Sequence, residues 1–112
     1  MKNRRLFVIS LVAAGLMLAA SSYAATPDGK ALYDAKCALC HGKDGVPLPV
    51  FAKKNAPNFQ DAAWQKSKTD AQLRKGIADG TAGTMMRGFA KELTAAEIDA
   101  VVAYVRKLAP AK

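Results

Sequence analysis

Apolar residues recur at helical spacing in the last part of the chain. They stand three or four positions apart, as one buried face of an α-helix requires: Ile98, Val101, Val102, Val105 and Leu108. The preceding segment Thr94-Ala95-Ala96-Glu97 has the sequence of a capping box, with threonine at the N-cap and glutamate three residues later. The pattern therefore predicts a helix from about residue 95 to residue 108.

A second capping box precedes a second apolar stripe in the middle of the chain. Thr69 and Gln72 form this box, and Leu73 and Ile77 follow at helical spacing. Gly80 suits a helix end. We expect a helix that begins after Thr69 and stops at Gly80.

Two further helices are predicted by their first residues. The segment Thr26-Pro27-Asp28 offers two capping side chains and a proline for the first turn, so a helix should follow and run to about Lys36. Asp61 can cap a short helix that extends through Trp64.

The first and last helices carry residues suited to a close crossing. Gly29 lets another element approach the first helix, and Tyr33 stands four residues later. Tyr104 lies near the apolar stripe of the last helix. We expect Tyr104 to meet Gly29 and Tyr33.

The N-terminal segment has the three parts of a secretory signal peptide. Lys2, Arg4 and Arg5 precede an apolar run of 15 residues, Leu6–Ala20, and Ser22-Tyr23-Ala24 offers a cleavage site after Ala24. The run is short for a membrane span, which needs about 18 apolar residues or more. An uncleaved anchor is the alternative. We therefore predict a signal peptide over 1–24 and a single domain over 25–112, with its net charge reduced from +8 to +5.

The pattern C-x-x-C-H organises the rest of the chain. Cys37-Ala38-Leu39-Cys40-His41 contains both cysteines and the one histidine of the 112 residues. This spacing lets two thiols bind one porphyrin covalently, while the histidine faces its iron. A thioredoxin-like redox pair is one alternative, but no convincing strand pattern lies nearby. A zinc site is another, but structural zinc takes four ligands and only three are present here.

A haem iron bound by His41 has one further axial position. Methionine is the natural candidate, and the chain after residue 24 has only Met85 and Met86, both in a glycine-flanked loop. The alternative is that both side chains fill a gap in the core. Two more features bear on the haem. The segment Pro47–Pro49 is a candidate acceptor for the second ring nitrogen of His41, and the alternative is that its prolines only form a turn. Gly76 suggests a close approach, such as that of a haem.

The chain resembles the class I c-type cytochromes, of the small bacterial periplasmic kind. The resemblance rests on four segments: Gly29-Lys30-Ala31-Leu32-Tyr33, Cys37-Ala38-Leu39-Cys40-His41-Gly42, Met86-Arg87-Gly88-Phe89, and Leu93-Thr94 through Tyr104. It implies an all-α fold in which three to five helices wrap around one covalently attached haem c and the N- and C-terminal helices cross.

The resemblance also implies site residues. Cys37 and Cys40 would form the thioethers, and His41 would be one axial ligand. In the family the ligand methionine stands three residues before a phenylalanine and usually precedes a proline. Met86 has this spacing, so it is the expected second ligand and Met85 the runner-up. The sequence departs from the family at Arg87, where proline is usual.

The implied function is electron transfer rather than catalysis: a periplasmic one-electron carrier between redox partners. A haem subunit of a periplasmic dehydrogenase and a gas- or peroxide-reactive haem are the alternatives. Basic residues scattered near the haem segments would suit partners with acidic docking surfaces: Lys36, Lys43, Lys53, Lys54, Lys66, Lys68, Arg87 and Lys91. No nucleic-acid-binding fold accompanies this charge. We expect no membrane span after cleavage, and a monomer or a small subunit.

Overall fold

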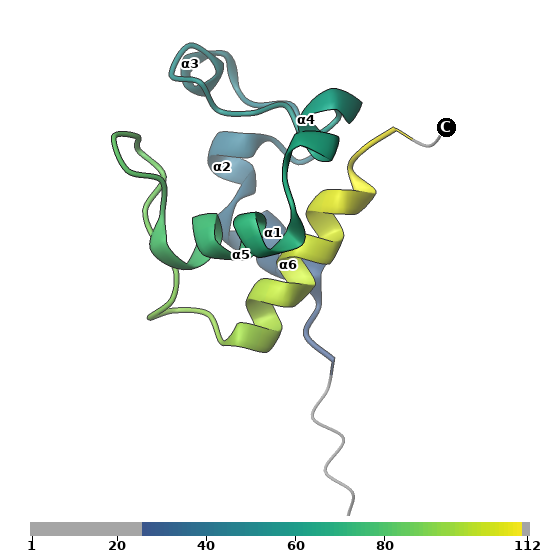
Figure 1. Cartoon of the computed structure of the whole chain (residues 1–112), viewed down its shortest axis with the longest axis vertical. Coiled ribbons are helices and arrows are strands. Elements are labelled where there is room, and N and C mark those ends of the chain that lie inside the picture. The colour runs from purple at the N-terminus through teal and green to yellow at the C-terminus, as the bar shows by residue number, and fades with distance from the viewer. Residues whose placement is uncertain (1–25, 111–112) are drawn as a thin grey trace, which may run out of the picture.

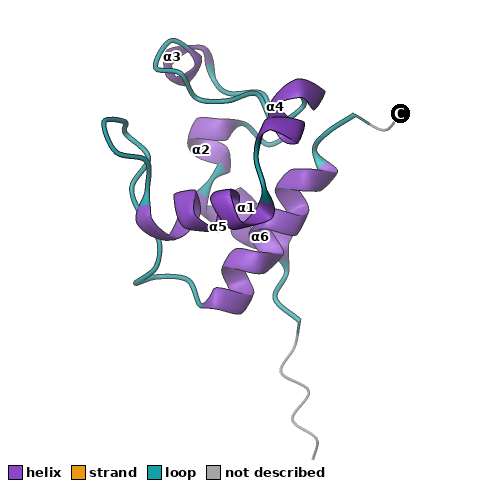
Figure 2. Ribbon diagram, viewed as in Figure 1, coloured by secondary structure: helices purple, strands orange, loops and turns teal. Residues whose placement is uncertain are grey.

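The computed structural model of the protein describes residues 26–110. Six helices lie in this range (Figure 1): α1 (Gly29–Lys36), α2 (Ala38–His41), α3 (Pro49–Ala52), α4 (Ala62–Ser67), α5 (Asp70–Asp79) and α6 (Ala95–Lys107). Loops connect them, and the described residues contain no strand, only an isolated β-bridge between Gly80 and Arg87 (Figure 2). The predicted all-α class is confirmed.

The four longer helices are those that the sequence predicts, and their caps are the predicted ones. Asp28 caps α1 by accepting a hydrogen bond from the amide of Ala31 at 3.1 Å. Asp61 caps α4. Thr69 and Thr94 form complete capping boxes at the starts of α5 and α6. Each cap satisfies amide groups that the helix itself leaves without a partner.

The two remaining helices, α2 and α3, are single turns of four residues each. Periodicity did not predict them, because four residues are too few to show a helical repeat. Helix α4 also continues three residues beyond Trp64, where the sequence-based expectation ended.

The core forms where α1 packs against α6 (Figure 1). A Cβ atom built on Gly29 would lie 2.2 Å from the carbonyl oxygen of Ala100, so only glycine fits this crossing. Tyr33 is fully buried, and its ring centroid lies 5.1 Å from that of Tyr104. The predicted meeting of Gly29, Tyr33 and Tyr104 is confirmed. The buried apolar residues are Tyr33, Phe59, Ile77, Phe89, Leu93, Ile98, Val101, Val102 and Val105.

A polar cluster joins α4 and α5 to α6. Buried Gln65 donates hydrogen bonds to the carbonyls of Phe59 (2.8 Å) and Val105 (3.0 Å). Arg106 donates to the backbone and side-chain oxygens of Gln65, and to Asp70 at 2.9 Å. We call these contacts the Gln65–Arg106 network. It satisfies buried carbonyl groups at the junction of three helices.

The predicted signal peptide over 1–24 lies outside the described residues, so the structure says nothing of it. Within residues 26–110, none of the helices has the length and apolar character needed to cross a membrane.

Candidate haem site

The Cys37–His41 segment is a tight helical turn at the end of α1. The amide of Cys37 donates to the carbonyl of Tyr33 at 2.8 Å, and the amide of His41 donates to the carbonyl of Cys37 at 2.9 Å. Gly42 ends the turn with φ = 77°, a conformation that favours glycine. Residues three and four positions apart share one face of a helical turn, so this turn gathers Cys37, Cys40 and His41 on one side.

Tyr33 anchors this turn through a side-chain hydrogen bond. Its hydroxyl donates a 2.6 Å hydrogen bond to the carbonyl of Gly42, the residue after His41. Sequence reasoning placed Tyr33 in the core but missed this bond, because nothing in the local pattern indicates which carbonyl a buried hydroxyl will reach. The bond links the α1–α6 crossing directly to the histidine turn.

Both cysteines are free thiols and are half-buried. Burial, with a smaller contribution from Cys40, raises the pKa of Cys37 to about 11. The thiol is therefore protonated at neutral pH. Cys37 also packs against the core, so its sulfur is held in place by apolar neighbours.

His41 is oriented by stacking. Its ring lies parallel to that of Phe59, with 4.7 Å between centroids and 22° between planes. Burial lowers the pKa of His41, so the ring is neutral at pH 7, as an imidazole ligand must be. Sequence reasoning did not predict the stacking on Phe59.

The predicted hydrogen bond from His41 to a carbonyl of Pro47–Pro49 is not formed. The Nδ1 atom of His41 is buried and has no hydrogen-bond partner within the described residues. The neighbouring contact is a backbone one, in which the amide of Leu48 donates to the carbonyl of Cys40 at 3.3 Å. This backbone bond uses the 47–49 segment to close the loop rather than to orient the ring.

The loop after α5 presents the two methionines differently. Met85 is 65% exposed, whereas Met86 is half-buried and packs against the core. The backbone of Met86 is held on both sides. Its amide donates to the Thr84 hydroxyl at 3.1 Å, and its carbonyl accepts from the amide of Thr81 at 3.0 Å. The loop therefore directs Met86 inward and leaves Met85 outside.

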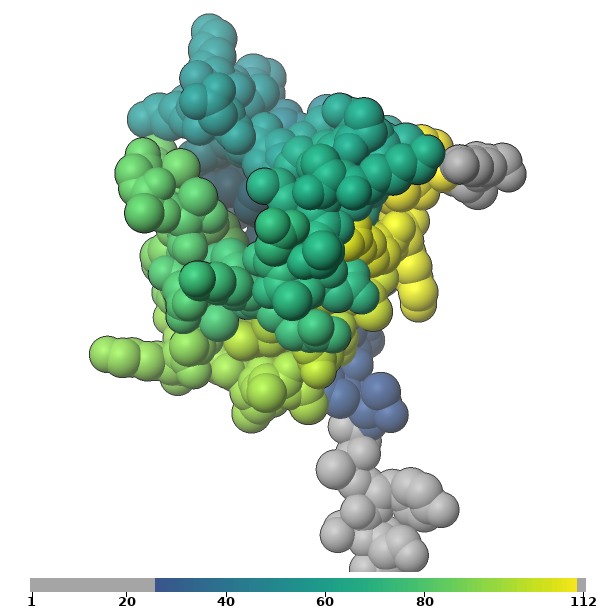
Figure 3. Space-filling model, in the orientation of Figure 1, coloured from purple at the N-terminus to yellow at the C-terminus, as the bar shows by residue number. Residues whose placement is uncertain are grey.

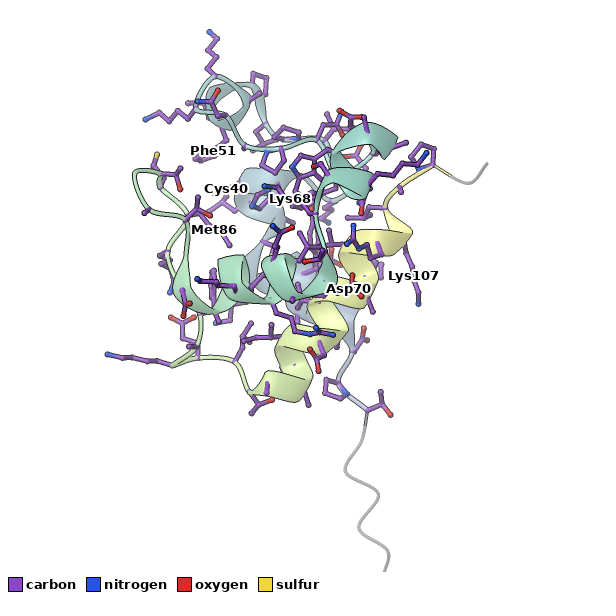
Figure 4. All side chains as sticks on the ribbon, viewed as in Figure 1. Cys40, Phe51, Lys68, Asp70, Met86 and Lys107 are labelled. Atoms are coloured by element: carbon purple, nitrogen blue, oxygen red, sulfur yellow. The ribbon has the colours of Figure 1, made fainter. Side chains whose placement is uncertain are left out.

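The molecular surface is hollowed between this loop and the segment that carries α3 (Figure 3). Figure 4 labels Cys40, Phe51 and Met86 around the hollow. The large hydrophobic residues that are exposed within 26–110 lie on α2, in and just before α3, and on the methionine loop: Leu39, Val46, Leu48, Val50 and Met85. Exposed apolar side chains concentrated in a few segments are typical of a binding site for an apolar partner.

Three further features of the structure bear on the sequence-based expectations. A cavity of about 310 Å³ lies between α5 and the start of α6, and none of its lining residues is a predicted haem contact. Gly76 has no protein atom within 4 Å of a built Cβ, so no other part of the described chain makes the close approach predicted there. Trp64 packs on Phe59, with 5.1 Å between ring centroids.

Comparison with known families shows which family this chain belongs to. The family model described as cytochrome c matches residues 27–109. This chain belongs to the cytochrome c family. The predicted resemblance to class I c-type cytochromes is thereby confirmed, and with it the small cytochrome c fold.

Known relatives of this cytochrome include parts of larger proteins. The dihydro-heme d1 dehydrogenase of Pseudomonas aeruginosa is 34% identical over 101 residues, which are 88% of this chain and 19% of the relative. The Cbb3-type cytochrome c oxidase subunit CcoP of Azospirillum brasilense is 34% identical over 90 residues, 80% of this chain and 30% of the relative. The chain thus spans less than a third of the length of these curated relatives.

A solved structure of similar size also matches. The KustC0563 c-type cytochrome superposes with a TM-score of 0.69 and is 37% identical, covering 74% of this chain and 99% of its own. The structure of the dihydro-heme d1 dehydrogenase NirN matches with a TM-score of 0.58, 34% identity, and coverage of 76% of this chain and 16% of that one.

A cytochrome c domain carries one covalently attached haem c, and the residues here fit that group. Cys37 and Cys40 have the spacing of its attachment site and are free. The exposed apolar side chains on α2, in and just before α3, and on the methionine loop suit a largely apolar macrocycle. Electron transfer through this haem is the activity that membership of the family implies.

Proposed function

We propose that this cytochrome is a periplasmic one-electron carrier whose haem iron is bound by His41 and Met86. The observation that carries the proposal is the contrast between the two methionines. Met86 is half-buried and its backbone is fastened on both sides, while Met85 is exposed. A side chain held in a defined inward position can keep an axial bond, whereas an exposed one must first be ordered, at a cost in conformational entropy.

Each residue of the site has a separate task in this proposal. The thiols of Cys37 and Cys40 fasten the haem, which when bound supplies the one-electron Fe(II)/Fe(III) couple. Phe59 holds the neutral ring of His41 in one plane. The Thr84 hydroxyl and the Thr81 amide keep Met86 in place. With His41 and Met86 both bound, the coordination of the iron would stay the same in both oxidation states.

The structure argues against a thiol–disulfide oxidoreductase. A redox-active C-x-x-C pair lowers the pKa of its attacking thiol, whereas here the pKa of Cys37 is raised to about 11. Within residues 26–110 there is also no sheet to provide the βαβ setting of a thioredoxin-like site. Neither feature opposes haem attachment.

Export and docking complete the proposal. Residues 1–24 would direct the chain to the periplasm and be removed after Ala24. Lys53 and Lys54 are exposed directly after α3, on the segment that borders the hollow. Such charges would steer an acidic redox partner toward the haem, and the transfer rate should then fall as salt is added. Lys36 and Arg87 are paired with Glu92 and contribute less to this field.

The test is an absorption spectrum of the haem-loaded protein, oxidised and reduced, for wild type, Met86→Ala and Met85→Ala. A ferric haem with a methionine ligand has a weak far-red band that a ligand-free iron lacks. We expect Met86→Ala to abolish this band and Met85→Ala to retain it. A wild-type spectrum without the band, together with carbon monoxide binding to the reduced form, would overturn the proposal in favour of a gas- or peroxide-reactive haem.

A second candidate is a haem subunit of a larger oxidoreductase, and the relatives favour it. One relative is a dehydrogenase and another is an oxidase subunit, and this chain matches only part of each. The match to 99% of the KustC0563 c-type cytochrome favours the separate carrier. Size-exclusion chromatography of periplasmic extract, followed at a haem absorption wavelength, separates the two: a carrier elutes alone, and a subunit elutes with its complex.

A further inference from the structure

Arg87 occupies a special position, because it directly follows the proposed ligand Met86. Arginine does not restrict its own backbone as a proline ring would. Within residues 26–110 the amide of Arg87 donates no hydrogen bond. The backbone at this residue is held by the bridge between Gly80 and Arg87, where the amide of Thr81 donates to the carbonyl of Met86. The next anchors lie further along, where the amides of Phe89 and Ala90 donate to Ile77 (2.8 Å) and Ala78 (3.1 Å).

The side chain of Arg87 is fastened as well. Its guanidinium makes two contacts with the carboxylate of Glu92, at 2.6 and 3.3 Å. It also lies 4.3 Å from the centre of the Phe89 ring, which is buried. A two-pronged carboxylate contact and an aromatic face fix the planar group in one orientation. We call this arrangement the Arg87–Glu92 clamp.

The clamp reaches the other side of the haem site through Lys36. The ammonium group of Lys36 lies 3.5 Å from the second carboxylate oxygen of Glu92. Lys36 is the last residue of α1 and directly precedes Cys37. One carboxylate therefore connects the chain next to Met86 with the chain next to the first haem-binding cysteine.

We infer that the Arg87–Glu92 clamp is a positioning device that keeps Met86 in reach of the haem iron. The inference rests on the proposed function, in which Met86 is the ligand. Arg87 acts through the backbone of its neighbour, and Glu92 joins that neighbour to the haem attachment segment. The pKa of Glu92 is held below its ordinary value by the hydrogen bond from Arg87, so the pair is charged at neutral pH.

The expected effect is moderate because the clamp is partly exposed. The side chains of Arg87 and Glu92 are 62% and 38% exposed, and such pairs are weak singly and screened by salt. The aromatic contact adds to the pair. We expect loss of the clamp to speed dissociation of the methionine about 5-fold, which corresponds to roughly 1 kcal/mol.

The experiment measures how fast imidazole displaces methionine from the ferric haem-loaded protein. At saturating imidazole this rate reports breaking of the methionine–iron bond. The variants are Arg87→Ala, Glu92→Gln, their combination, and Arg87→Pro. Arg74→Ala is the matched control, because Arg74 pairs with Asp99 on the exposed surface away from the methionine loop.

The clamp predicts a specific displacement rate for each variant. Arg87→Ala should speed displacement about 5-fold, and Glu92→Gln should speed it less, because the contact of Arg87 with Phe89 remains. The double variant should add little to Arg87→Ala, because both changes remove the same ion pair. In Arg87→Pro the displacement of methionine should be slow again, because proline restricts the backbone and costs no hydrogen bond at this position. High salt should speed the displacement of methionine in wild type but not in Arg87→Ala. Arg74→Ala should show the wild-type displacement rate.

Two failures can be told apart. The clamp is refuted, while Met86 stays the ligand, if imidazole displaces methionine from Arg87→Ala at the wild-type rate in low salt. The same holds if Arg74→Ala speeds displacement as much as Arg87→Ala does. If the far-red band survives in Met86→Ala and is lost in Met85→Ala, the ligand assignment itself has failed, and the clamp with it. Far-UV circular dichroism of each variant confirms that it is folded.

Discussion

The close crossing of α1 and α6 requires a glycine at position 29. Gly29 has no side chain, and a Cβ atom added there would lie 2.2 Å from the carbonyl oxygen of Ala100. Cβ atoms essentially never approach other atoms within 3.0 Å, so the two helices would have to separate by at least 0.8 Å. Tyr33 and Val101, both buried at this crossing, would lose close contact with their neighbours.

We therefore expect Gly29→Ala to destabilise the haem-loaded protein by about 2 kcal/mol, within the range for overpacking a core. For a domain of this size the melting temperature should fall by about 10 °C. Urea unfolding followed by circular dichroism measures the change. The slope of the free energy against urea should stay the same, because the surface exposed on unfolding changes little.

Gly76→Ala is the matched control. Gly76 lies inside α5, and a Cβ atom there meets no protein atom within 4 Å. Alanine is the better helix former, so this variant should be as stable as wild type or more stable by up to about 1 kcal/mol. If Gly29→Ala is instead within about 0.5 kcal/mol of wild type, the crossing is not as tight as the structure shows. A destabilised Gly76→Ala would mean that the space beside Gly76 is filled in the haem-loaded protein.

Three other outcomes are expected. Gln65→Ala should cost about 2–3 kcal/mol in urea unfolding, because it leaves the Phe59 carbonyl without a donor and removes a second bond to the Val105 carbonyl. Gln60→Ala loses only a surface bond to Asp44 and should cost less than about 1 kcal/mol; equal costs would refute the role of the network. Tyr33→Phe should lose about 1 kcal/mol through its bond to Gly42, and a loss near that of core truncation would show that more than the hydroxyl is involved. The pKa of Glu92 is lowered from 4.5, first by its hydrogen bond from Arg87. The contribution of Glu92 to stability is therefore complete above about pH 5 and disappears as the pH falls through the lowered pKa. The stability difference between wild type and Glu92→Gln should shrink on acidification, and a constant difference from neutral to acid pH would contradict this.

Local sequence determined the longer helices. Asp28, Asp61, Thr69 and Thr94 cap the helices whose starts they predicted. A cap and an apolar repeat act over a few residues, so they can be recognised without knowing the fold. The same holds for the spacing from Cys37 to His41, since one helical turn suffices to place the cysteines and the histidine together.

The crossing of the first and last helices was also open to sequence reasoning. Gly29, Tyr33 and Tyr104 were expected to meet, and they do. Here a missing side chain and two large rings are complementary features that a close helix crossing requires. The resemblance to a known family placed them on the same two helices.

Tertiary structure alone decided how the site is held. The stacking of Phe59 on His41, the bond from Tyr33 to Gly42, and the clamp of Arg87 with Glu92 were not predicted. The acceptor expected for His41 in Pro47–Pro49 was wrong for the same reason. Long polar and aromatic side chains reach several positions, and which one they occupy depends on elements brought together only by folding. Local sequence specified the helices and the haem attachment turn, and the packed fold specified the contacts that hold them in register.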